Sequence, residues 1–347
     1  MDDLTTSAAA TPLTPKDFSA DQEVRWCPGC GDYSILKAVR KVLAEESASV
    51  DNTVFVSGIG CAARFSYYMS TYGFHTVHGR APGFATGIKL ANQELDVWVV
   101  SGDGDALSIG GNHFIHMLRR NVDVQFLLFN NAIYGLTKGQ YSPTTKSGSR
   151  TPSSPMGSIE TPLSACRLAL GANGTFVARA VDTAQKHLPE VLRRAHGHKG
   201  TAFVEILQNC HVFNDNYFSN FTARDVADDR QIVVEHGEPL IFGKERNKGL
   251  RITSGKMELE VVTVGENGVV ENDILIHDET NRELASLLAS MDTLEMPMAV
   301  GVLYCIEREP FAERVLEQVA ERKKELPNAT LDALFRQGAT WTVSDAD

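Results

Sequence analysis

The sequence of 347 residues has no long hydrophobic run. Its longest apolar stretches, such as Val97–Val100 and Phe126–Phe129, are far shorter than the roughly 20 residues that a helix needs to cross a bilayer. The first residues, Met1 to Leu4 and the Ala/Thr/Ser stretch behind them, lack the basic opening and the apolar segment of a secretory signal. We therefore expect no membrane span and a cytoplasmic protein that begins with a solvated tail over residues 1–20.

Positive charge and cysteine are also scarce. Lys and Arg number 33 against 44 Asp and Glu, which gives a formal net charge of −11 with neutral histidines. This balance argues against broad nucleic-acid binding. Six cysteines are too few for a disulfide scaffold in a chain of this size, so their placement is more informative than their number. Because 43% of the residues are hydrophobic, the chain can bury a substantial core, and a soluble globular enzyme is the default class.

What is present is a repeating pattern of elements. From Gly31 to about Ile206, short β-rich runs alternate with helical stretches, which is typical of an α/β fold with a doubly wound, mostly parallel sheet and helices on both faces. Asp32 is placed to cap a helix whose apolar side chains share one face: Ile35, Leu36, Val39, Val42 and Leu43. Strands are expected at 53–57, 97–100, 124–129, 175–179 and 201–206, and helices near 81–91, 113–120 and 183–196.

Two stretches have no such period. Residues 141–161 are rich in Ser, Thr, Pro, Gly and Lys, which predicts a long loop, and long loops in compact domains are usually functional. After Phe221 the composition becomes charged, and residues 237–257 are expected to form an irregular segment that wraps the surface.

The pattern becomes regular again near the end of the sequence. Residues 299–306 predict a strand, and Pro310 opens a helix with Phe311, Val315 and Val319 on one face. We expect three parts in the chain: the tail at 1–20, a cofactor-binding domain at 21–222 and a C-terminal extension at 223–347.

The sharpest local signal is a pair of polar loops at strand ends. Gly102-Asp103-Gly104 follows the predicted strand at 97–100, and Asn130-Asn131 follows the next strand. Gly-Asp-Gly on its own would be interpreted as a turn. However, 25 residues separate Gly104 from Asn130, enough for one helix and one strand, so the two loops arrive side by side at the carboxyl edge of the sheet. Glycine lets the backbone approach a diphosphate, and the Asp103 carboxylate offers the hard oxygen that Mg²⁺ prefers.

This arrangement resembles the thiamine diphosphate motif, in which Asn-Asn follows Gly-Asp-Gly by some two dozen residues. The continuation from Tyr134 to Gln140 is more similar to the β subunits of the 2-oxoacid:ferredoxin oxidoreductases than to other thiamine enzymes. The resemblance covers about residues 20–245 and implies the thiamine diphosphate-binding fold. It implies three Mg²⁺ ligands, which are Asp103, the Asn131 side chain and the Ile133 main-chain carbonyl, with Asn130 the less favoured asparagine. Implied contacts to the organic cofactor are Ile59, Gly60, Cys61, Gly102, Gly104, Gly135, Leu136 and Thr137.

Four cysteines form a second constellation. One tight pair, Cys27 and Cys30, has the Cys-Pro-Gly-Cys spacing, which suits zinc, a redox disulfide or an iron–sulfur cluster and does not decide among them. Cys61 and Cys210 follow predicted strands, and four thiolates at one sheet edge can hold a [4Fe–4S] cluster. The same four positions resemble the cluster ligands of the family. The two remaining cysteines, Cys166 on a predicted helix and Cys305 on a predicted strand, are interpreted as buried small hydrophobic residues.

Basic residues near these loops are candidates for substrate contacts. His78-Gly79-Arg80 precedes a predicted helix and by itself would be a turn with an exposed Arg80 ion pair. The resemblance places these three residues against thiamine, although Pro82-Gly83 departs from the Leu-Pro of many relatives. Arg64 and Lys138 suit a substrate carboxylate, whereas isolated basic residues are more often solvated. The family has basic residues at both positions, which favours a dicarboxylic 2-oxoacid.

The resemblance implies a complete reaction. A chain of this family takes part in the coenzyme A-dependent oxidative decarboxylation of 2-oxoglutarate to succinyl-CoA and CO₂, with electrons passed through the cluster to ferredoxin. The glutamate that activates thiamine belongs to a separate α subunit in this family, so we expect an α₂β₂ assembly and an isolated chain that binds its cluster without turning over substrate.

Three alternatives stay open at this point. Pyruvate or a broad range of 2-oxoacids competes with 2-oxoglutarate as substrate. A non-redox thiamine lyase or synthase would share Asp103 and Asn131 but has no use for four separated thiols. A zinc-binding interaction subunit would explain Cys27 and Cys30 while leaving the pairing of the two polar loops to coincidence.

Overall fold

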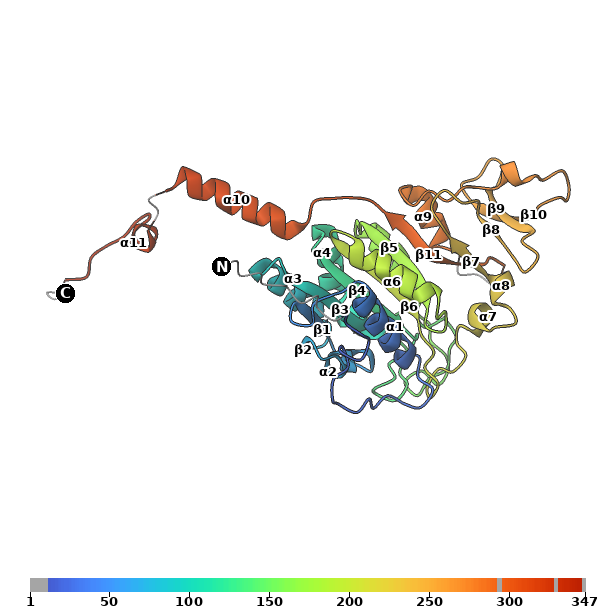
Figure 1. Ribbon diagram of the computed structural model, residues 1–347, viewed down its shortest axis with the longest axis horizontal. Coiled ribbons are helices and arrows are strands. Elements are labelled where there is room, and N and C mark those ends of the chain that lie inside the picture. Colours follow the sequence, from blue (N-terminus) through green and yellow to red (C-terminus); the bar gives the residue numbers. More distant parts are fainter. Residues whose placement is uncertain (1–11, 292–294, 328–329, 345–347) are drawn as a thin grey trace, which may run out of the picture.

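An eight-stranded sheet forms the centre of the computed structural model, which describes residues 12–291, 295–327 and 330–344 (Figure 1). The strand order is β2-β1-β3-β4-β6-β5-β11-β7. Neighbouring strands are parallel except β11, which runs antiparallel to β5. The strands are β1 (Thr53–Ser57), β2 (Tyr72–His75), β3 (Asp96–Gly102), β4 (Val124–Asn130), β5 (Phe176–Val181), β6 (Thr201–Leu207), β7 (Gln231–Val234) and β11 (Met298–Cys305).

Helices cover both faces of this sheet. One layer contains α1 (Asp32–Glu45) and α6 (His187–Gly197), and the other contains α3 (Ala81–Ala91), α4 (Gly111–Arg120), α5 (Ala165–Gly171) and α9 (Arg282–Leu288). Strand β3 shows why two layers form. Trp98 and Val100 pack toward the first layer, while Val97 and Val99 pack toward the second, because successive side chains of a strand point to opposite faces. The predicted α/β architecture is confirmed.

Several predicted elements have the expected bounds, including β1 and α3. The prediction for Asp32 was wrong in detail. Helix α1 begins at Asp32, Gly31 occupies the N-cap position, and no side chain caps the helix. The Asp32 side chain is buried instead and hydrogen-bonds with Cys30, so it belongs to the surroundings of the cysteines.

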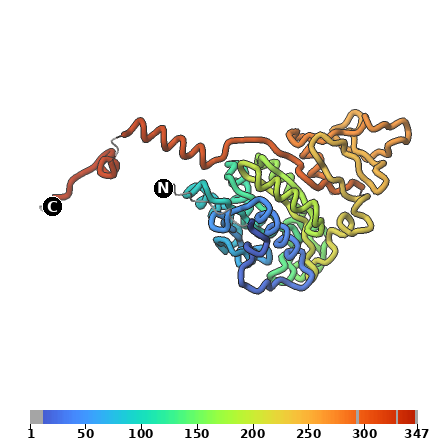
Figure 2. Tube along the Cα trace, in the orientation of Figure 1, coloured from blue at the N-terminus to red at the C-terminus, as the bar shows by residue number. Residues whose placement is uncertain are grey.

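The segment at 237–257 was predicted to be irregular, and this was also wrong. It contributes to a second, three-stranded antiparallel sheet made of β8 (Ile241–Phe242), β9 (Lys248–Ile252) and β10 (Leu259–Thr263). Phe242 and Leu250 are buried in it. The strands are too short for a clear alternation of apolar and polar residues, which explains why the pattern was missed. This small sheet lies beyond the β7 edge of the large sheet (Figure 2).

The two ends of the described chain differ in how they meet the body of the protein. Residues 1–11 of the predicted tail lie outside the described residues, and Phe18 is fully buried. Helix α10 (Phe311–Glu325) starts after Pro310 as predicted and projects from the body together with α11 (Leu331–Phe335) (Figure 1). Phe311 at its start packs against the core, whereas Leu316 and Val319 further along stay 48% and 42% exposed among the described residues.

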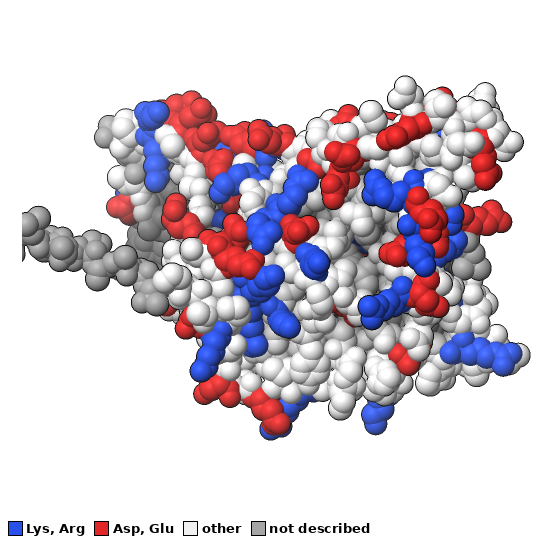
Figure 3. Space-filling model, turned by 45° about the vertical axis from the view of Figure 1, so that its right-hand side comes forward, with Lys and Arg blue, Asp and Glu red and all other residues white. Residues whose placement is uncertain are grey.

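The surface mixes charges of both signs. On the face shown in Figure 3, basic side chains are interspersed with acidic ones. Among the described residues, no helix combines the length and apolar character required to span a membrane.

Candidate functional site

The predicted site lies at the carboxyl edge of the large sheet. In the sheet, β2 lies next to β1 on one side, whereas β4 lies next to β3 on the other side. The strand order therefore reverses between β1 and β3, and a crevice opens there at the carboxyl ends of the strands. The loops after β1, β3 and β4 line a cavity of about 140 Å³ there. The cavity wall includes Ile59, Gly60, Cys61, His78, Asp103 and Asn131. Sequence positions far apart are therefore brought to one cavity.

Asp103 is the buried carboxylate of this cavity, with 1% of its surface exposed. Its Oδ2 atom accepts hydrogen bonds from Ser142 Oγ at 2.5 Å and Thr144 Oγ1 at 2.6 Å. Burial raises the pKa of Asp103 to about 6, although both hydroxyls act in the opposite direction. A buried carboxylate of this kind fits a bound cation, because the cation offsets the cost of burying the charge. The hydroxyls come from the long loop at 141–161, and sequence analysis did not single them out.

The two asparagines of the neighbouring loop have separate roles. Asn130 is buried, with its side-chain nitrogen donating to Glu205 Oε1 at 2.7 Å and its side-chain oxygen accepting from the Ala132 backbone N–H at 3.2 Å. Asn131 faces the cavity, and within the described residues its Oδ1 atom accepts a hydrogen bond only from the Ile133 backbone N–H, at 3.1 Å. The geometry thus leaves oxygen capacity for a metal on Asn131 and little on Asn130.

Asp105 is a functional residue that sequence reasoning missed. It is 3% exposed, and its Oδ1 atom accepts hydrogen bonds from Ile59 N at 3.1 Å, Gly79 N at 2.7 Å and His78 Nδ1 at 2.5 Å. Its Oδ2 atom accepts from Ser101 Oγ at 2.5 Å. One carboxylate therefore holds together the loops after β1 and β3 and the loop before α3. The available signal was the second aspartate of Gly-Asp-Gly-Asp, which was not used.

Gly104 and Tyr134 explain the close approach of the two polar loops. A Cβ atom at Gly104 would lie 2.2 Å from Tyr134 Cε1, so only glycine leaves room for the ring. The Tyr134 hydroxyl donates to the Gly104 carbonyl at 2.9 Å. Leu136 and Thr137 of the same loop reach the cavity wall, and the Thr137 hydroxyl hydrogen-bonds with Gln140.

The four predicted ligand cysteines come together beside this cavity. Gly135 faces two of them, because a Cβ atom placed on it would lie 3.5 Å from Cys210 Sγ and 3.6 Å from Cys61 Sγ. Cys27 and Cys30 form the turn before α1, with Cys30 N donating to Cys27 O at 3.1 Å. This turn is tied to β6 through Gly31 N, which donates to Asn209 O at 3.3 Å. All four thiols are free.

The surroundings of these thiols fit an iron–sulfur cluster. Burial raises the pKa of Cys61 to about 12, and the nearby Asp32 carboxylate and the other thiols act in the same direction. Burial also raises the pKa of Cys30 and of Cys210. Thiolates gathered here need bound positive charge, which iron would supply. Within the described part of the chain, no group of three or more His, Cys, Asp and Glu side chains is arranged to hold a single metal ion.

The other two cysteines lie away from this group. Cys166 on α5 is fully buried, as predicted, and its Sγ atom lies 3.1 Å from Glu205 Oε2. Cys305 ends β11 and is only half-buried, so the prediction that it is a buried hydrophobic residue was wrong. Cys305 is the last residue of the strand, where the helices cover the side chain only in part.

The basic residues predicted to contact cofactor or substrate have different environments. His78 lines the cavity. Arg80 donates from Nη1 to the Ile109 carbonyl at 2.9 Å, a hydrogen bond that takes the place of the ion pair expected for an exposed turn. Arg64 is half-buried and donates to the Arg25 carbonyl at 2.9 Å, and Lys138 is exposed with φ +77°.

A buried ion pair supports the loop that carries Asn130 and Asn131. Arg179 on β5 and Glu205 on β6 are each 3% exposed, with Arg179 Nε 2.8 Å from Glu205 Oε2. Burial alone would raise the pKa of Glu205, but Arg179 holds it below its usual value. Because Glu205 also accepts from Asn130, the pair fixes the asparagine loop. Both residues occupy central strands of the sheet, where a charged residue in an apolar run was the overlooked signal.

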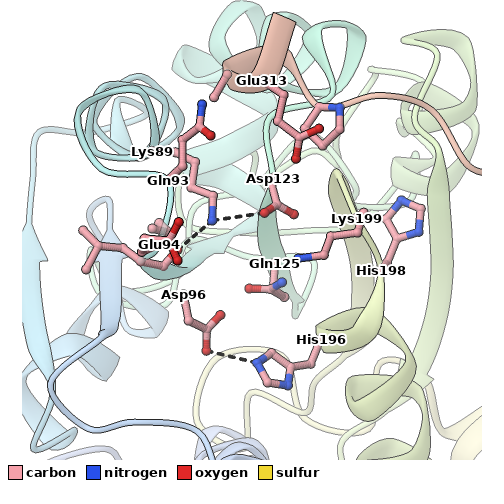
Figure 4. Close-up of a pocket in the computed structure, with 14 residues that line it drawn as sticks. Lys89, Gln93, Glu94, Asp96, Asp123, Gln125, His196, His198, Lys199 and Glu313 are labelled. Atoms are coloured by element: carbon pink, nitrogen blue, oxygen red, sulfur yellow. Dashed lines mark hydrogen bonds and ion pairs between the residues drawn. The ribbon is translucent and has the colours of Figure 1, made fainter. Parts of the chain in front are cut away.

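A larger cavity of about 310 Å³ lies at the opposite edge of the sheet, where β3, β4 and β6 begin (Figure 4). Lys89 Nζ lies 3.0 Å from Asp123 Oδ2, and His196 Nε2 lies 3.1 Å from Asp96 Oδ2. The hydrogen bond to Asp96 raises the pKa of His196. These charges pair with one another, so we interpret them as support for the amino edge of the sheet.

Comparison with known proteins agrees with this geometry. Residues 58–206 match the family described as "Thiamine pyrophosphate enzyme, C-terminal TPP binding domain". The chain is 48% identical over 337 residues to the 2-oxoglutarate oxidoreductase subunit KorB of Mycobacterium tuberculosis, covering 96% of this chain and 89% of the relative. It is 47% identical over 196 residues to the β subunit of 2-oxoacid:ferredoxin oxidoreductase 1 of Aeropyrum pernix, covering 56% of this chain and 62% of the relative.

A solved structure shows the same fold over nearly the whole length. It is the 2-oxoglutarate:ferredoxin oxidoreductase of Magnetococcus marinus with 2-oxoglutarate, coenzyme A and succinyl-CoA bound. The TM-score is 0.73 at 29% identity, covering 94% of this chain and 97% of that chain. Fold and site thus define a thiamine diphosphate-binding α/β subunit. The chain belongs to the β-subunit family of the 2-oxoacid:ferredoxin oxidoreductases, which confirms the resemblance noted in the sequence.

Proposed function

We propose that this chain is the β subunit of a 2-oxoglutarate:ferredoxin oxidoreductase that converts 2-oxoglutarate and coenzyme A to succinyl-CoA and CO₂ while two electrons pass one at a time to ferredoxin. The observation that carries the proposal is the loop Asn131–Thr137, which lines the cofactor cavity and also packs against Cys61 and Cys210. One loop therefore separates a thiamine site from a sulfur-rich site, as a decarboxylase coupled to single-electron transfer requires.

Residues of this chain would hold the cofactor and its metal ion. Asp103, the Asn131 side chain and the Ile133 carbonyl would hold Mg²⁺, and the amides of the Asn131–Thr137 loop with the Thr137 hydroxyl would hold the diphosphate. Bound thiamine diphosphate supplies the electron sink for decarboxylation. Asp105 keeps His78 oriented toward the cavity through the bond to Nδ1. Further proposed contacts are Ile59, Gly60, Gly79, Arg80, Gly102, Gly104 and Leu136.

Cys27, Cys30, Cys61 and Cys210 would hold a [4Fe–4S] cluster, which supplies a one-electron relay when bound. Gly135 leaves the space between the cofactor cavity and the sulfur atoms free of a side chain. This lets the cofactor and the cluster lie close together, and a short distance between them would favour electron transfer.

We further propose that Arg64 and Lys138 bind the distal carboxylate of the substrate. Arg64 lies three residues after Cys61, and Lys138 extends the cofactor loop. Arg64→Met and Lys138→Met should raise the KM for 2-oxoglutarate about tenfold or more, and raise the KM for pyruvate less, because pyruvate has no second carboxylate. Lys37→Met, on the exposed face of α1, is the matched control and should leave both values unchanged.

The α subunit completes the enzyme in this proposal, with an α₂β₂ stoichiometry. The test is to purify the chain anaerobically, alone and with the product of its neighbouring gene, and to measure iron, sulfide and substrate-dependent ferredoxin reduction. We expect a brown protein with four irons per chain, no turnover by the chain alone, and turnover with 2-oxoglutarate in the complex.

Other outcomes identify the rival functions. Faster turnover with pyruvate would assign the pyruvate or broad-range enzyme. Carboligation or non-oxidative decarboxylation without iron would assign a thiamine lyase or synthase. Zinc in place of iron, without thiamine diphosphate binding, would indicate an interaction subunit.

A further inference from the structure

Gln208 is a buried amide beside the cysteine group. It is the first residue after β6, is 1% exposed, and its backbone N–H donates to Asn130 O at 2.8 Å. Its side-chain nitrogen lies 3.3 Å from Cys30 Sγ and 2.7 Å from the Asn209 carbonyl oxygen. The amide therefore spans from the end of β6 to the turn that carries the cysteine pair.

The orientation of this amide follows from its neighbours. The Asn209 carbonyl can only accept hydrogen bonds, so the side-chain nitrogen of Gln208 must face it. The second N–H of the same nitrogen then points to Cys30. The amide oxygen is buried and has no partner in the described structure. An unpaired buried amide oxygen is costly, and folding alone gives no reason to place a glutamine rather than an apolar residue here.

We propose that Gln208 is a positioning residue that donates an N–H···S hydrogen bond to the Cys30 thiolate of the bound cluster and so raises its reduction potential. This inference rests on the cluster of the proposed function. Reduction adds negative charge to a cluster and its thiolates, and a hydrogen bond to sulfur stabilises that charge. The bond acts strongly because Gln208 is excluded from water.

The charges around Cys30 give this bond its importance. Asp32 hydrogen-bonds with Cys30, and Asp182 lies behind the turn, with Oδ2 accepting from Asn209 N at 3.0 Å. Both carboxyl groups are buried, and negative charge on either opposes reduction of a nearby cluster. The backbone N–H groups of residues 212–214 face Cys210 instead. Gln208 therefore supplies a side-chain donor at Cys30, in addition to the Asp32 backbone N–H and next to the Asp32 carboxylate.

The test is an EPR-monitored redox titration of the complete complex with wild-type chain and with Gln208→Met. Methionine keeps the length and burial of the side chain but cannot donate. We expect the equilibrium constant for cluster reduction to fall between about threefold and tenfold, the upper end being about 59 mV for one electron. The matched control is Gln185→Met, because Gln185 donates to Ser34 Oγ at 3.0 Å in an exposed position and should leave the potential unchanged.

A second measurement uses only wild-type protein. With glutamine labelled at its side-chain nitrogen with ¹⁵N, pulsed EPR of the reduced cluster should show a ¹⁵N coupling that the unlabelled protein lacks. If Gln208→Met fails to load the cluster, this spectrum decides, and an absent coupling overturns the inference.

The proposed cluster and the role of Gln208 can be refuted separately. Wild-type complex without iron and sulfide would refute the proposed cluster and with it the proposed function. A fully loaded cluster whose potential is the same in wild type and Gln208→Met would refute the role of Gln208 and leave the proposed function standing.

Discussion

Replacing Asp105 by alanine should destabilise the protein and loosen the cofactor cavity. The carboxylate accepts hydrogen bonds from the backbone of Ile59 and Gly79 and from the side chains of His78 and Ser101. Two backbone N–H groups lose their acceptor in Asp105→Ala. Each buried donor left unpaired costs about 1–3 kcal/mol, so the pair gives about 2–6 kcal/mol of lost stability.

Asp105→Asn separates hydrogen bonding from charge. The amide can keep its oxygen toward Ile59 and Gly79 and turn its nitrogen toward Ser101, whose hydroxyl can accept. We expect this variant to lose only about 1–2 kcal/mol, because neutral hydrogen bonds replace charge-assisted ones. Asp225→Ala is the control: Asp225 is exposed, and a surface substitution of this kind usually changes stability by within about 0.5 kcal/mol.

Urea unfolding followed by circular dichroism measures the stability, and calorimetric titration with thiamine diphosphate and Mg²⁺ on the complete complex measures the cavity. We expect wild type and Asp225→Ala to be the most stable, Asp105→Asn to be less stable and Asp105→Ala to be the least stable. The affinity for the cofactor should decrease in the same order. If Asp105→Ala unfolds at the wild-type urea concentration and binds the cofactor equally well, this carboxylate does not hold the three loops together.

Three further predictions concern other parts of the fold. Arg179→Met should cost about 3–5 kcal/mol in urea unfolding because it leaves Glu205 buried without its cation, and adding Glu205→Gln should recover part of the loss. Gly104→Ala should weaken thiamine diphosphate binding at least tenfold, since the new methyl group displaces the Tyr134 ring, and calorimetry of Gly104→Ala/Tyr134→Ala should show partial recovery if that clash is the cause. Burial lowers the pKa of His198 to about 4 from 6.5, so its contribution to stability is present above pH 6.5 and is lost as the pH falls toward 4. His198→Gln should reduce the loss of unfolding free energy between pH 6.5 and 4 by roughly 1–2 kcal/mol, less than the full pKa shift implies because the side chain is partly exposed. If the variant loses as much stability as the wild type over this pH range, His198 does not cause the loss.

Local patterns along the chain predicted six strands of the large sheet and named the candidate ligands, whereas the edge strands β2 and β7 were not predicted. Strand β1 and helix α3 have the predicted bounds, because a short β-branched apolar run and the apolar face of a helix are local properties of the sequence. The candidate ligands were proposed because Gly-Asp-Gly and Asn-Asn follow strands, and the carboxyl ends of parallel strands meet at one edge; their role as ligands stays a prediction. Their chemistry is set by residue type, so Asp103 and the four cysteines could be named before any contact was known.

The tertiary structure alone decided how these residues are held. Ser142 and Thr144 reach Asp103 from a loop without a period, and Gln208 reaches Cys30 across 178 positions of sequence. Such contacts depend on how distant segments pack, and a packing partner leaves no mark on the local pattern. Residue type and order thus determined what this protein can bind, whereas folding determined which charges and hydrogen bonds surround each ligand, because those depend on distances that only the assembled sheet defines.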